Sequence, residues 1–293
     1  MPLDMGDGDI AFPHLGIYLH NLPQGFTIFG FYVALYGVII GIGVVLAFLL
    51  ISKLAKKYGQ KPDDYYELGC FLVIFGIIGA RLYYVIFSWD YYKNHLGSIF
   101  NIRQGGLAIY GGVIAGFITL ILWCKIRKKS MRMAGDLCFP GVLVGQIMGR
   151  WGNFANREAF GTYTDSLFAM RLPVAAVRES DIDEAIRAHM DPSGNYIQVH
   201  PTFLYESMYN LCLLILILVF HEKKAFEGEV ILWYFGGYGI GRFFIEGLRT
   251  DSLMLGSTGI AVSQMLGMIL FVTALTIDIV VRVRMHKTKK AEV

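Results

Sequence analysis

Basic, acidic and amide side chains arrive together in the middle of the chain, directly after a long apolar run. The run from 137 to 149 carries no charge, and the next nine residues, 150 to 158, hold two arginines, two asparagines and a glutamate. The planar fork of arginine suits phosphate, and ionisable groups at the edge of an apolar segment are costly unless they are paired or face a polar cavity. Arginines that only anchor a helix end among lipid headgroups are the plain alternative, but anchoring needs neither the asparagines nor the three glycines of Gly149–Gly161.

Three more charged positions follow one helical face further along the chain. Arg242, Glu246 and Arg249 are spaced i, i+4 and i+7, which places them on one side of a helix. Glu246 is expected to bridge both arginines, which leaves this face with a net positive charge. An ion-pair ladder at a membrane interface is the structural alternative.

A single arginine interrupts the second apolar block of the chain. Arg81 follows Gly79 and Ala80, and a charge in such a block needs a carboxylate, a backbone carbonyl or a bound anion. A structural ion pair and a ligand site are both open at this position.

Tyr110 lies between two pairs of glycines, Gly105-Gly106 and Gly111-Gly112, at the beginning of another apolar block. Glycine pairs at the mouth of a membrane span permit irregular backbone or the close approach of a ligand. A glycine-rich helix contact is the alternative. The sequence does not decide whether three further polar residues serve binding or packing. They are Tyr36, His200 and Glu206.

Long apolar blocks dominate the chain and must position these side chains. Hydrophobic residues make up 55% of the 293 positions, which is too large a share for a soluble domain, and a membrane span needs roughly 20 apolar residues. The pattern predicts an all-α membrane protein, with a single integral-membrane domain over 1–293 and a bundle of seven transmembrane helices. The predicted spans are 26–52, 67–89, 107–125, 134–150, 204–221, 229–247 and 259–281.

Lysine and arginine collect after the first, third, fifth and seventh predicted spans, whereas residues 1–25 contain neither. By the positive-inside rule these four basic segments are cytoplasmic. The N-terminus then lies outside and the C-terminus inside, as an odd number of spans requires. The polar segment 151–203 is expected to form a small extracytoplasmic head. Because no basic region precedes an early apolar core, we expect no cleaved signal peptide.

The chemistry of the remaining residues narrows the class of reaction. No serine, threonine or cysteine stands in a nucleophile motif, and no group of His, Asp or Glu has the spacing of metal ligands. The four cysteines fall in or beside apolar blocks and are expected to serve core packing. Arginines that converge at the headgroup level predict a phosphate-bearing substrate taken from the bilayer. An enzyme built this way takes its nucleophile from the second substrate.

The stretch Gly149–Gly161 resembles the signature of the prolipoprotein diacylglyceryl transferase family, G-R-x-G-N-F-x-N-x-E-x-x-G, at every fixed position. Further similar blocks follow the family order along nearly the whole chain. They are Tyr36-Gly37, Gly79-Ala80-Arg81, His200-Pro201 with Leu204-Tyr205-Glu206, and Arg242 with Glu246 and Arg249.

The resemblance implies transfer of the sn-1,2-diacylglyceryl group from phosphatidylglycerol to the lipobox cysteine of a prolipoprotein, with a thioether formed and sn-glycerol 1-phosphate released. This alkyl-type transfer is the first step of bacterial lipoprotein modification. The implied partners are phosphatidylglycerol, signal peptides with a lipobox cysteine and the bilayer, with no nucleic acid and no metal or organic cofactor. The implied location is the bacterial cytoplasmic (inner) membrane, with the active site toward its outer face.

The resemblance also implies roles for individual residues. Arg150 is expected to bind the phosphate of phosphatidylglycerol, and Arg242 to stabilise the negative charge that develops there. Glu246 and Arg249 are expected to support Arg242. The other substrate-binding candidates are Tyr36, Arg81, Asn153, Asn156, Glu158, Gly161, His200 and Glu206.

Two positions depart from the family pattern. Tyr110 stands where some members have a histidine that has been proposed as the catalytic base. A phenol is a poor base at neutral pH because its ordinary pKa is about 10. Either Tyr110 only makes a hydrogen bond, or a positive field makes it more acidic, or the thiol loses its proton without it. Leu35 stands where the family often has tryptophan, a change that we expect to be tolerated.

Two other classes of membrane protein fit part of the pattern. An anionic-lipid transporter or flippase also uses intramembrane arginines and glycine-broken helices, but the chain has no internal repeat and its charges lie at the outer ends of helices. A purely structural membrane subunit does not need Arg150, Asn153 and Glu158 in one short loop. Product mass separates an enzyme from a flippase, because a flippase changes no covalent bond.

Overall fold

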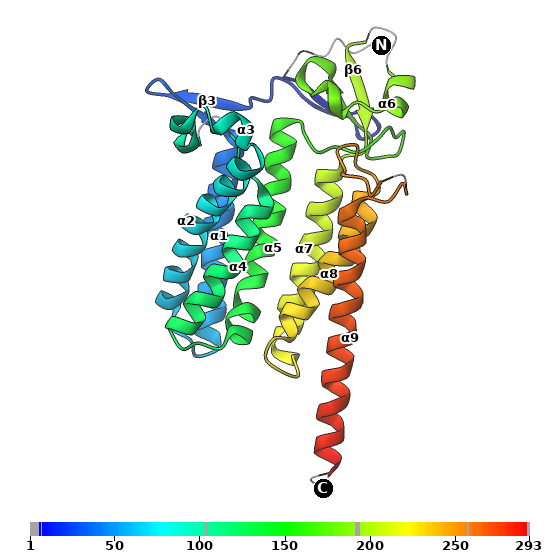
Figure 1. The fold of residues 1–293 in the computed structure, drawn as a ribbon. Coiled ribbons are helices and arrows are strands. Elements are labelled where there is room, and N and C mark those ends of the chain that lie inside the picture. Colours follow the sequence, from blue (N-terminus) through cyan, green and yellow to red (C-terminus); the bar gives the residue numbers. More distant parts are fainter. Residues whose placement is uncertain (1–5, 7, 103–104, 191–193, 257, 292–293) are drawn as a thin grey trace. The chain divides into compact units, whose positions relative to one another are not determined.

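The computed structural model describes residues 6, 8–102, 105–190, 194–256 and 258–291, and the chain is mostly helical (Figure 1). It forms two compact units. The first combines Met1–Ala47 with Phe139–Val293, and the second is Phe48–Cys138. Of the candidate site residues, Arg81 and Tyr110 belong to the second unit and the others to the first.

Long helices occupy the segments that the sequence predicts as spans. They are α1 Leu35–Lys57, α2 Pro62–Phe87, α4 Ile109–Ile126, α5 Met131–Asn156, α7 Thr202–Phe220, α8 Glu229–Glu246 and α9 Val262–Ala291. Among the described residues, five helices are long and apolar enough to cross a membrane: α1, α2, α4, α9, and α7 extended to Lys223. The other two, α5 and α8, carry Arg150 and Arg242. The count of seven spans therefore remains a prediction.

The first predicted span is wrong over its first nine residues. Residues 26–34 belong to a hairpin of β3 Gly25–Ile28 and β4 Phe31–Ala34, which pair antiparallel, and α1 begins only at Leu35. Phe29 and Gly30 form the turn with φ of 47° and 79°, the positive values that a two-residue hairpin loop requires. Aromatic and β-branched residues favour strands, and hydropathy alone does not separate such a hairpin from a helix.

A small sheet combines strands from the two stretches of sequence that form the first unit. Its order is β2-β1-β5-β6, with β1 Ile10–Phe12, β2 Ile17–Leu19, β5 Met170–Pro173 and β6 Tyr196–Val199, all antiparallel. The short helix α6 Glu184–Ala188 contributes Ile186 to the apolar core of this layer, together with Ile10, Leu172 and Ile197. The chain was predicted to be all-α, and this sheet makes the fold mostly helical instead. Two of its strands lie in the polar segment 151–203, and the N-terminal residues supply the other two.

Arg157 ties the N-terminal residues to the end of α5. Its side chain is buried, and Nη2 donates hydrogen bonds to the carbonyl oxygens of Gly8 and Leu22, both at 2.7 Å. Burial lowers the pKa of Arg157, although Asp9 opposes the shift. The residue also has a φ of 56°, a conformation that non-glycine residues rarely adopt. These hydrogen bonds give Arg157 a structural role.

In the second unit, α2 packs against α4 at a glycine crossing. A Cβ atom on Gly111 would lie 2.3 Å from the carbonyl oxygen of Gly79, so a side chain at either residue would separate the helices. The Gly111-Gly112 pair thus makes a helix contact, which was one of the two open alternatives. Gly105 and Gly106 instead have positive φ values of 88° and 74°, which glycine adopts without strain.

The first unit contains a second crossing of this kind, between α8 and α9 (Figure 1). A Cβ atom on Gly239 would lie 2.5 Å from the carbonyl oxygen of Gly267, and one on Gly267 would lie 2.6 Å from the carbonyl oxygen of Gly239. α7 packs on the same helix α8. This packing brings Glu206 of α7 next to Arg242 of α8. The cysteines only partly meet their prediction, since Cys124 and Cys138 are buried but Cys70 and Cys212 are exposed.

Candidate active site

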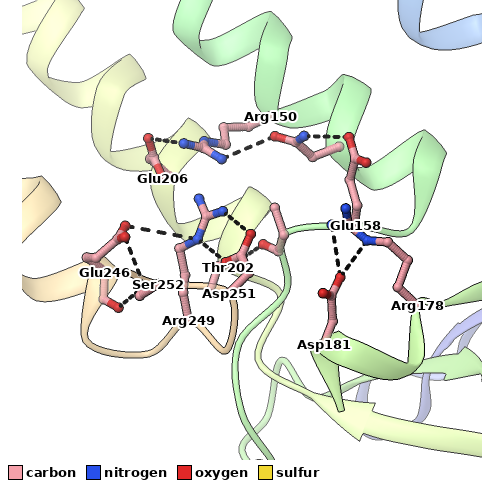
Figure 2. A network of polar contacts seen from close by, with 12 residues as sticks. Arg150, Glu158, Arg178, Asp181, Thr202, Glu206, Glu246, Arg249, Asp251 and Ser252 are labelled. Atoms are coloured by element: carbon pink, nitrogen blue, oxygen red, sulfur yellow. Dashed lines mark hydrogen bonds and ion pairs between the residues drawn. The ribbon is translucent and has the colours of Figure 1, made fainter. Parts of the chain in front are cut away.

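Glu206 joins the two arginines that lead the sequence prediction. α7 begins at Thr202, directly after Pro201, and its second turn carries Glu206 with only 4% of the side chain exposed. Oε1 of Glu206 lies 2.9 Å from Nη2 of Arg150 (Figure 2). Oε2 lies 3.2 Å from Nη1 of Arg242. One carboxylate therefore links α5, α7 and α8.

Glu246 at the end of α8 and Asp251 in the turn after it add two more carboxylates. Oε2 of Glu246 lies 2.6 Å from Nη2 of Arg242 but 4.0 Å from Nε of Arg249. Arg249 instead donates from Nε and Nη2 to the two carboxylate oxygens of Asp251, at 2.9 and 2.7 Å (Figure 2). Burial opposes ionisation of Asp251, but Arg249 outweighs it and holds the pKa of Asp251 below its usual value. Glu246 was predicted to bridge Arg242 and Arg249, and its short contact is with Arg242.

The guanidinium and carboxylate groups of this cluster balance in formal charge. We define the arginine cluster as six residues: Arg150, Arg242, Arg249, Glu206, Glu246 and Asp251. Its three cations meet three anions, so the predicted net positive charge is wrong. The error arose because Glu206 comes from another helix and Asp251 from the turn after α8, outside the i, i+4, i+7 pattern.

The groups of the cluster differ in exposure. The side chains of Arg150 and Arg242 are 17% and 18% exposed, whereas those of Glu206 and Glu246 are 4% and 5% exposed. The carboxylates of Glu206 and Glu246 therefore lie deeper than the guanidinium groups of Arg150 and Arg242, whereas Asp251 is more exposed than Arg249. Among the described residues, Arg150 makes one hydrogen bond to Asn153 and Arg242 makes one to Glu206, and each makes one further ion pair through its other Nη atom. A guanidinium group carries five N–H donors. An anion that approaches the exposed side meets donors whose orientation is already fixed.

A chain of amide contacts leads from Arg150 to Glu158. α5 continues to Asn156 instead of ending at Arg150, which places Asn153 one turn beyond the arginine on the same face. Arg150 donates from Nη1 to Oδ1 of Asn153 at 3.1 Å, and Asn153 donates from Nδ2 to Oε1 of Glu158 at 2.9 Å. Asn156 donates to the same Glu158 oxygen at 3.3 Å. The sequence signature thus forms one connected polar surface.

Tyr36 and Gly152 lie against each other. A Cβ atom on Gly152 would come within 2.7 Å of the Tyr36 ring, so the glycine of the signature gives the ring room beside α5. Tyr36 of α1 therefore contacts α5 two residues beyond Arg150.

Gly161 lies where three segments of backbone meet. It donates its N–H to the carbonyl oxygen of His200 at 2.9 Å and pairs with Arg249 in an isolated bridge. A Cβ atom there would lie 2.6 Å from the carbonyl oxygen of Leu248 and 2.8 Å from the Cβ of His200. These contacts give Gly161 a structural reason to be glycine, since only glycine lets the segments approach so closely.

His200 also holds this junction through its backbone, because its N–H donates to the carbonyl oxygen of Thr162 at 3.0 Å. Its ring nitrogen Nδ1 lies 3.3 Å from the hydroxyl of Tyr205. Burial lowers the pKa of His200, which favours the neutral ring. The backbone contact with Thr162 favours a structural role for His200.

Arg81 has no donor left for a ligand. Within the second unit its five guanidinium N–H groups donate to backbone carbonyl oxygens at 2.6 to 3.0 Å. The five acceptors belong to Ser98, Ile99, Asn101, Gly105 and Gly106. The structure therefore favours the backbone-carbonyl alternative for Arg81.

Tyr110 occupies the first turn of α4 in the second unit. Its ring lies 6.5 Å from that of Tyr83 between centroids, at an angle of 43°. More than half of its surface is exposed. No contact described within this unit gives the hydroxyl a proton acceptor.

Sequence reasoning missed three residues of this site. Asp251 pairs with Arg249, and Ser252 donates from Oγ to Oε1 of Glu246 at 2.8 Å (Figure 2). Tyr238 lies one turn before Arg242 on α8 and interacts electrostatically with Arg150, Arg242, Glu206 and Glu246. The i−4 spacing from Arg242 could have identified Tyr238, whereas a turn has no such period. No group of metal-ligating side chains occurs among the described residues.

Comparisons with known proteins match most of the amino-acid sequence. A family model described as prolipoprotein diacylglyceryl transferase matches residues 23–280. The phosphatidylglycerol–prolipoprotein diacylglyceryl transferase of Limosilactobacillus reuteri (strain DSM 20016) is 43% identical over 256 residues, which are 86% of this chain and 87% of that protein. The proteins of the same name from Finegoldia magna and Listeria monocytogenes serotype 4a are 39% and 42% identical over 255 and 253 residues. These cover 87% and 86% of this chain, and 93% and 86% of those relatives.

Proposed function

Because the chain belongs to the prolipoprotein diacylglyceryl transferase family, we propose that its arginine cluster binds the phosphate of phosphatidylglycerol where the lipid is cleaved. The chain is a transferase of the first step of lipoprotein modification, with phosphatidylglycerol and a prolipoprotein as its substrates. The observation that carries the proposal is the single buried carboxylate of Glu206 that orients both Arg150 and Arg242.

The reaction replaces a carbon–oxygen bond by a carbon–sulfur bond. The thiolate of the lipobox cysteine attacks the glyceryl carbon that carries the phosphate, and the bonding electron pair leaves on the phosphate oxygen. A thioether and glycerol phosphate result, and no acyl-enzyme forms. The thiol has an ordinary pKa of about 8.5 and must lose its proton to react.

Negative charge increases on the phosphate as the carbon–oxygen bond breaks, from a diester with one charge to a monoester with two. Guanidinium groups that are already oriented stabilise this increase without having to rearrange. Arg150 and Arg242 fill this role because their carboxylate partners hold them from the buried side. The charge balance within the cluster itself also limits its affinity for the doubly charged product, which must leave after each turnover.

The amide and carboxylate groups beyond Arg150 suit the glycerol headgroup. Asn153, Asn156 and Glu158 offer donors and acceptors next to one another, and a headgroup hydroxyl can serve as either. This arrangement distinguishes phosphatidylglycerol from lipids whose headgroups lack hydroxyl groups. Gly161 acts here by letting its own backbone approach those of His200 and Leu248 closely.

We place the site toward the outer face of the bacterial cytoplasmic membrane. Seven spans with an external N-terminus put residues 151–203 outside and the basic segments inside. The lipobox cysteine of an exported prolipoprotein reaches this face. Within the described part of the chain, five helices of suitable length and composition support a membrane location.

The test is product formation by the purified full-length protein in detergent, supplied with phosphatidylglycerol and a lipobox peptide. We expect the mass of the peptide to rise by one diacylglyceryl group. A peptide with serine in place of its cysteine is the control and must stay unmodified. An unmodified cysteine peptide, together with movement of labelled phosphatidylglycerol between the leaflets of vesicles, would instead identify a flippase.

A further inference from the structure

The turn after α8 makes two contacts that the reaction described above does not use. Asp251 accepts two hydrogen bonds from Arg249, and Ser252 donates from Oγ to Oε1 of Glu246 at 2.8 Å (Figure 2). Ser252 also contacts the backbone carbonyl oxygen of Glu246 at 3.3 Å. Neither residue contacts Arg150 or Arg242 by a hydrogen bond within the described part of the chain.

Glu246 lies between two arginines that compete for it. Its Oε2 is 2.6 Å from Arg242 but 4.0 Å from Arg249. Asp251 satisfies Arg249 through both carboxylate oxygens, which is the strongest geometry for this pair. With Arg249 satisfied and Oε1 held by Ser252, the remaining oxygen of Glu246 faces Arg242.

We propose that Ser252 and Asp251 are positioning residues that direct the carboxylate of Glu246 to Arg242, through one hydrogen bond to Glu246 and one bidentate pair with Arg249. The proposal rests on the proposed function only in assuming that Arg242 stabilises the departing phosphate. It assigns a catalytic purpose to a turn whose residues lie outside the helical pattern.

The order of effects follows from these contacts. Loss of the Ser252 hydroxyl frees Oε1 of Glu246, so the carboxylate can rotate away from Arg242. Loss of the Asp251 charge leaves Arg249 without its partner, and Arg249 then draws Glu246 toward itself. In both cases Arg242 loses orientation rather than charge. An orientation that matters mainly in the transition state lowers kcat more than it raises KM.

The decisive experiment is a double-mutant cycle between Ser252 and Glu246, with kcat and the KM for phosphatidylglycerol measured separately. We expect Ser252→Ala to lower kcat about tenfold, the effect of one hydrogen bond to a charged group, and to leave KM within about twofold. Ser252→Thr keeps the hydroxyl and should restore kcat. Introduced into Glu246→Ala protein, which has no side-chain acceptor for Ser252, Ser252→Ala should cause no further loss, because coupled residues are not additive.

Ser180 supplies a matched control, because its hydroxyl donates to the carboxylate of Asp181 at 3.1 Å in a separate part of the first unit. Ser180→Ala should leave kcat unchanged. Equal losses in Ser180→Ala and Ser252→Ala proteins, or a Ser252→Ala loss that persists in full on the Glu246→Ala background, would overturn the proposal.

A structure of Asp251→Asn protein gives a readout that does not depend on activity. We expect Oε2 of Glu246 to move from Arg242 to Arg249, and an unchanged Glu246 would contradict the proposal even in an inactive preparation. Wild-type protein that forms no product, with Glu246 moved in the variant, would instead count against the proposed function alone.

Discussion

At the scale of single residues, Glu206 has the greatest influence on the candidate site. It is buried and forms ion pairs with two arginines on different helices. Removing one member of such a buried ionic group leaves the others uncompensated, which costs about 3 to 5 kcal/mol. We therefore predict that Glu206→Ala lowers the thermal unfolding temperature of the detergent-solubilised protein markedly, while Glu206→Gln has a smaller effect because the amide can still accept one hydrogen bond.

Glu179 provides the comparison for this prediction, since it is an exposed carboxylate that lies 3.5 Å from Nη2 of Arg187. Exposed pairs contribute roughly 0 to 1 kcal/mol. Glu179→Ala should leave the unfolding temperature nearly unchanged. Equal shifts for the Glu179 and Glu206 variants would show that the cluster does not stabilise the fold as its burial suggests.

Tyr110 is the second residue whose role a substitution can decide. Removal of a general base typically lowers the rate by roughly 10² to 10⁴. Since a phenol is a poor base, we predict that Tyr110→Phe loses much less than this in kcat at pH 7, as measured by the mass assay. A loss of 10² or more, in protein that unfolds at the wild-type temperature, would make the hydroxyl a catalytic group.

The residues of the cluster were predictable to the extent that they lie on helices. Arg150, Arg242 and Glu246 follow from spacing and from the signature. Glu206 was a substrate-binding candidate, and its pairing with both arginines was not predicted. Asp251 and Ser252 were not predictable because a turn has no period that brings side chains to one face. Arg81 had open alternatives, and only the positions of backbone carbonyl oxygens decide between them.

At the scale of elements, the junction around Gly161 connects the small sheet to the helices of the first unit. Gly161→Ala would bring a Cβ atom to 2.6 Å from the carbonyl oxygen of Leu248, and backbone at this point cannot move without disturbing Arg249. We predict that Gly161→Ala lowers both the unfolding temperature and the activity. Gly236→Ala is the control, because its new Cβ atom would meet Ala274 at an ordinary 3.6 Å. Wild-type activity in the Gly161→Ala protein would refute this role.

The elements themselves were predictable where they are long and apolar. The helices occupy the predicted segments, but their ends differ because hydropathy does not detect a hairpin before α1 or a polar last turn in α5. The four-stranded sheet was missed for a different reason. β1 pairs with β5, about 160 residues away in the sequence by the pairing of Ala11 with Arg171, and no local pattern reveals such a partner.

At the scale of the whole molecule, the seven-span topology is the main open prediction. It makes Glu179 external and Lys125, Lys223 and Lys287 cytoplasmic. We predict that a membrane-impermeant maleimide labels Glu179→Cys protein in intact cells, and labels the three lysine-to-cysteine variants only after permeabilisation. The unsubstituted chain measures the background from the natural cysteines.

The labelling pattern also tests individually the two long helices of lower hydropathy, α5 and α8. If α5 did not cross the membrane, positions 125 and 179 would be labelled from the same side. If α8 did not cross, positions 223 and 287 would be labelled from opposite sides. Either result would require a new placement of the arginine cluster relative to the bilayer.

The central claim is that Arg150 and Arg242 stabilise the charge that develops on the phosphate. The most direct measurement is kcat for diacylglyceryl transfer by Arg150→Ala and Arg242→Ala proteins. Arg187→Ala is the control, because this arginine is half exposed and pairs with Glu179, which is not part of the cluster. We predict losses of about 10² to 10³ for the first two, in protein that remains folded, and none for the third. If both cluster variants retained the kcat of Arg187→Ala protein, the arginines would be headgroup anchors and the account would be wrong.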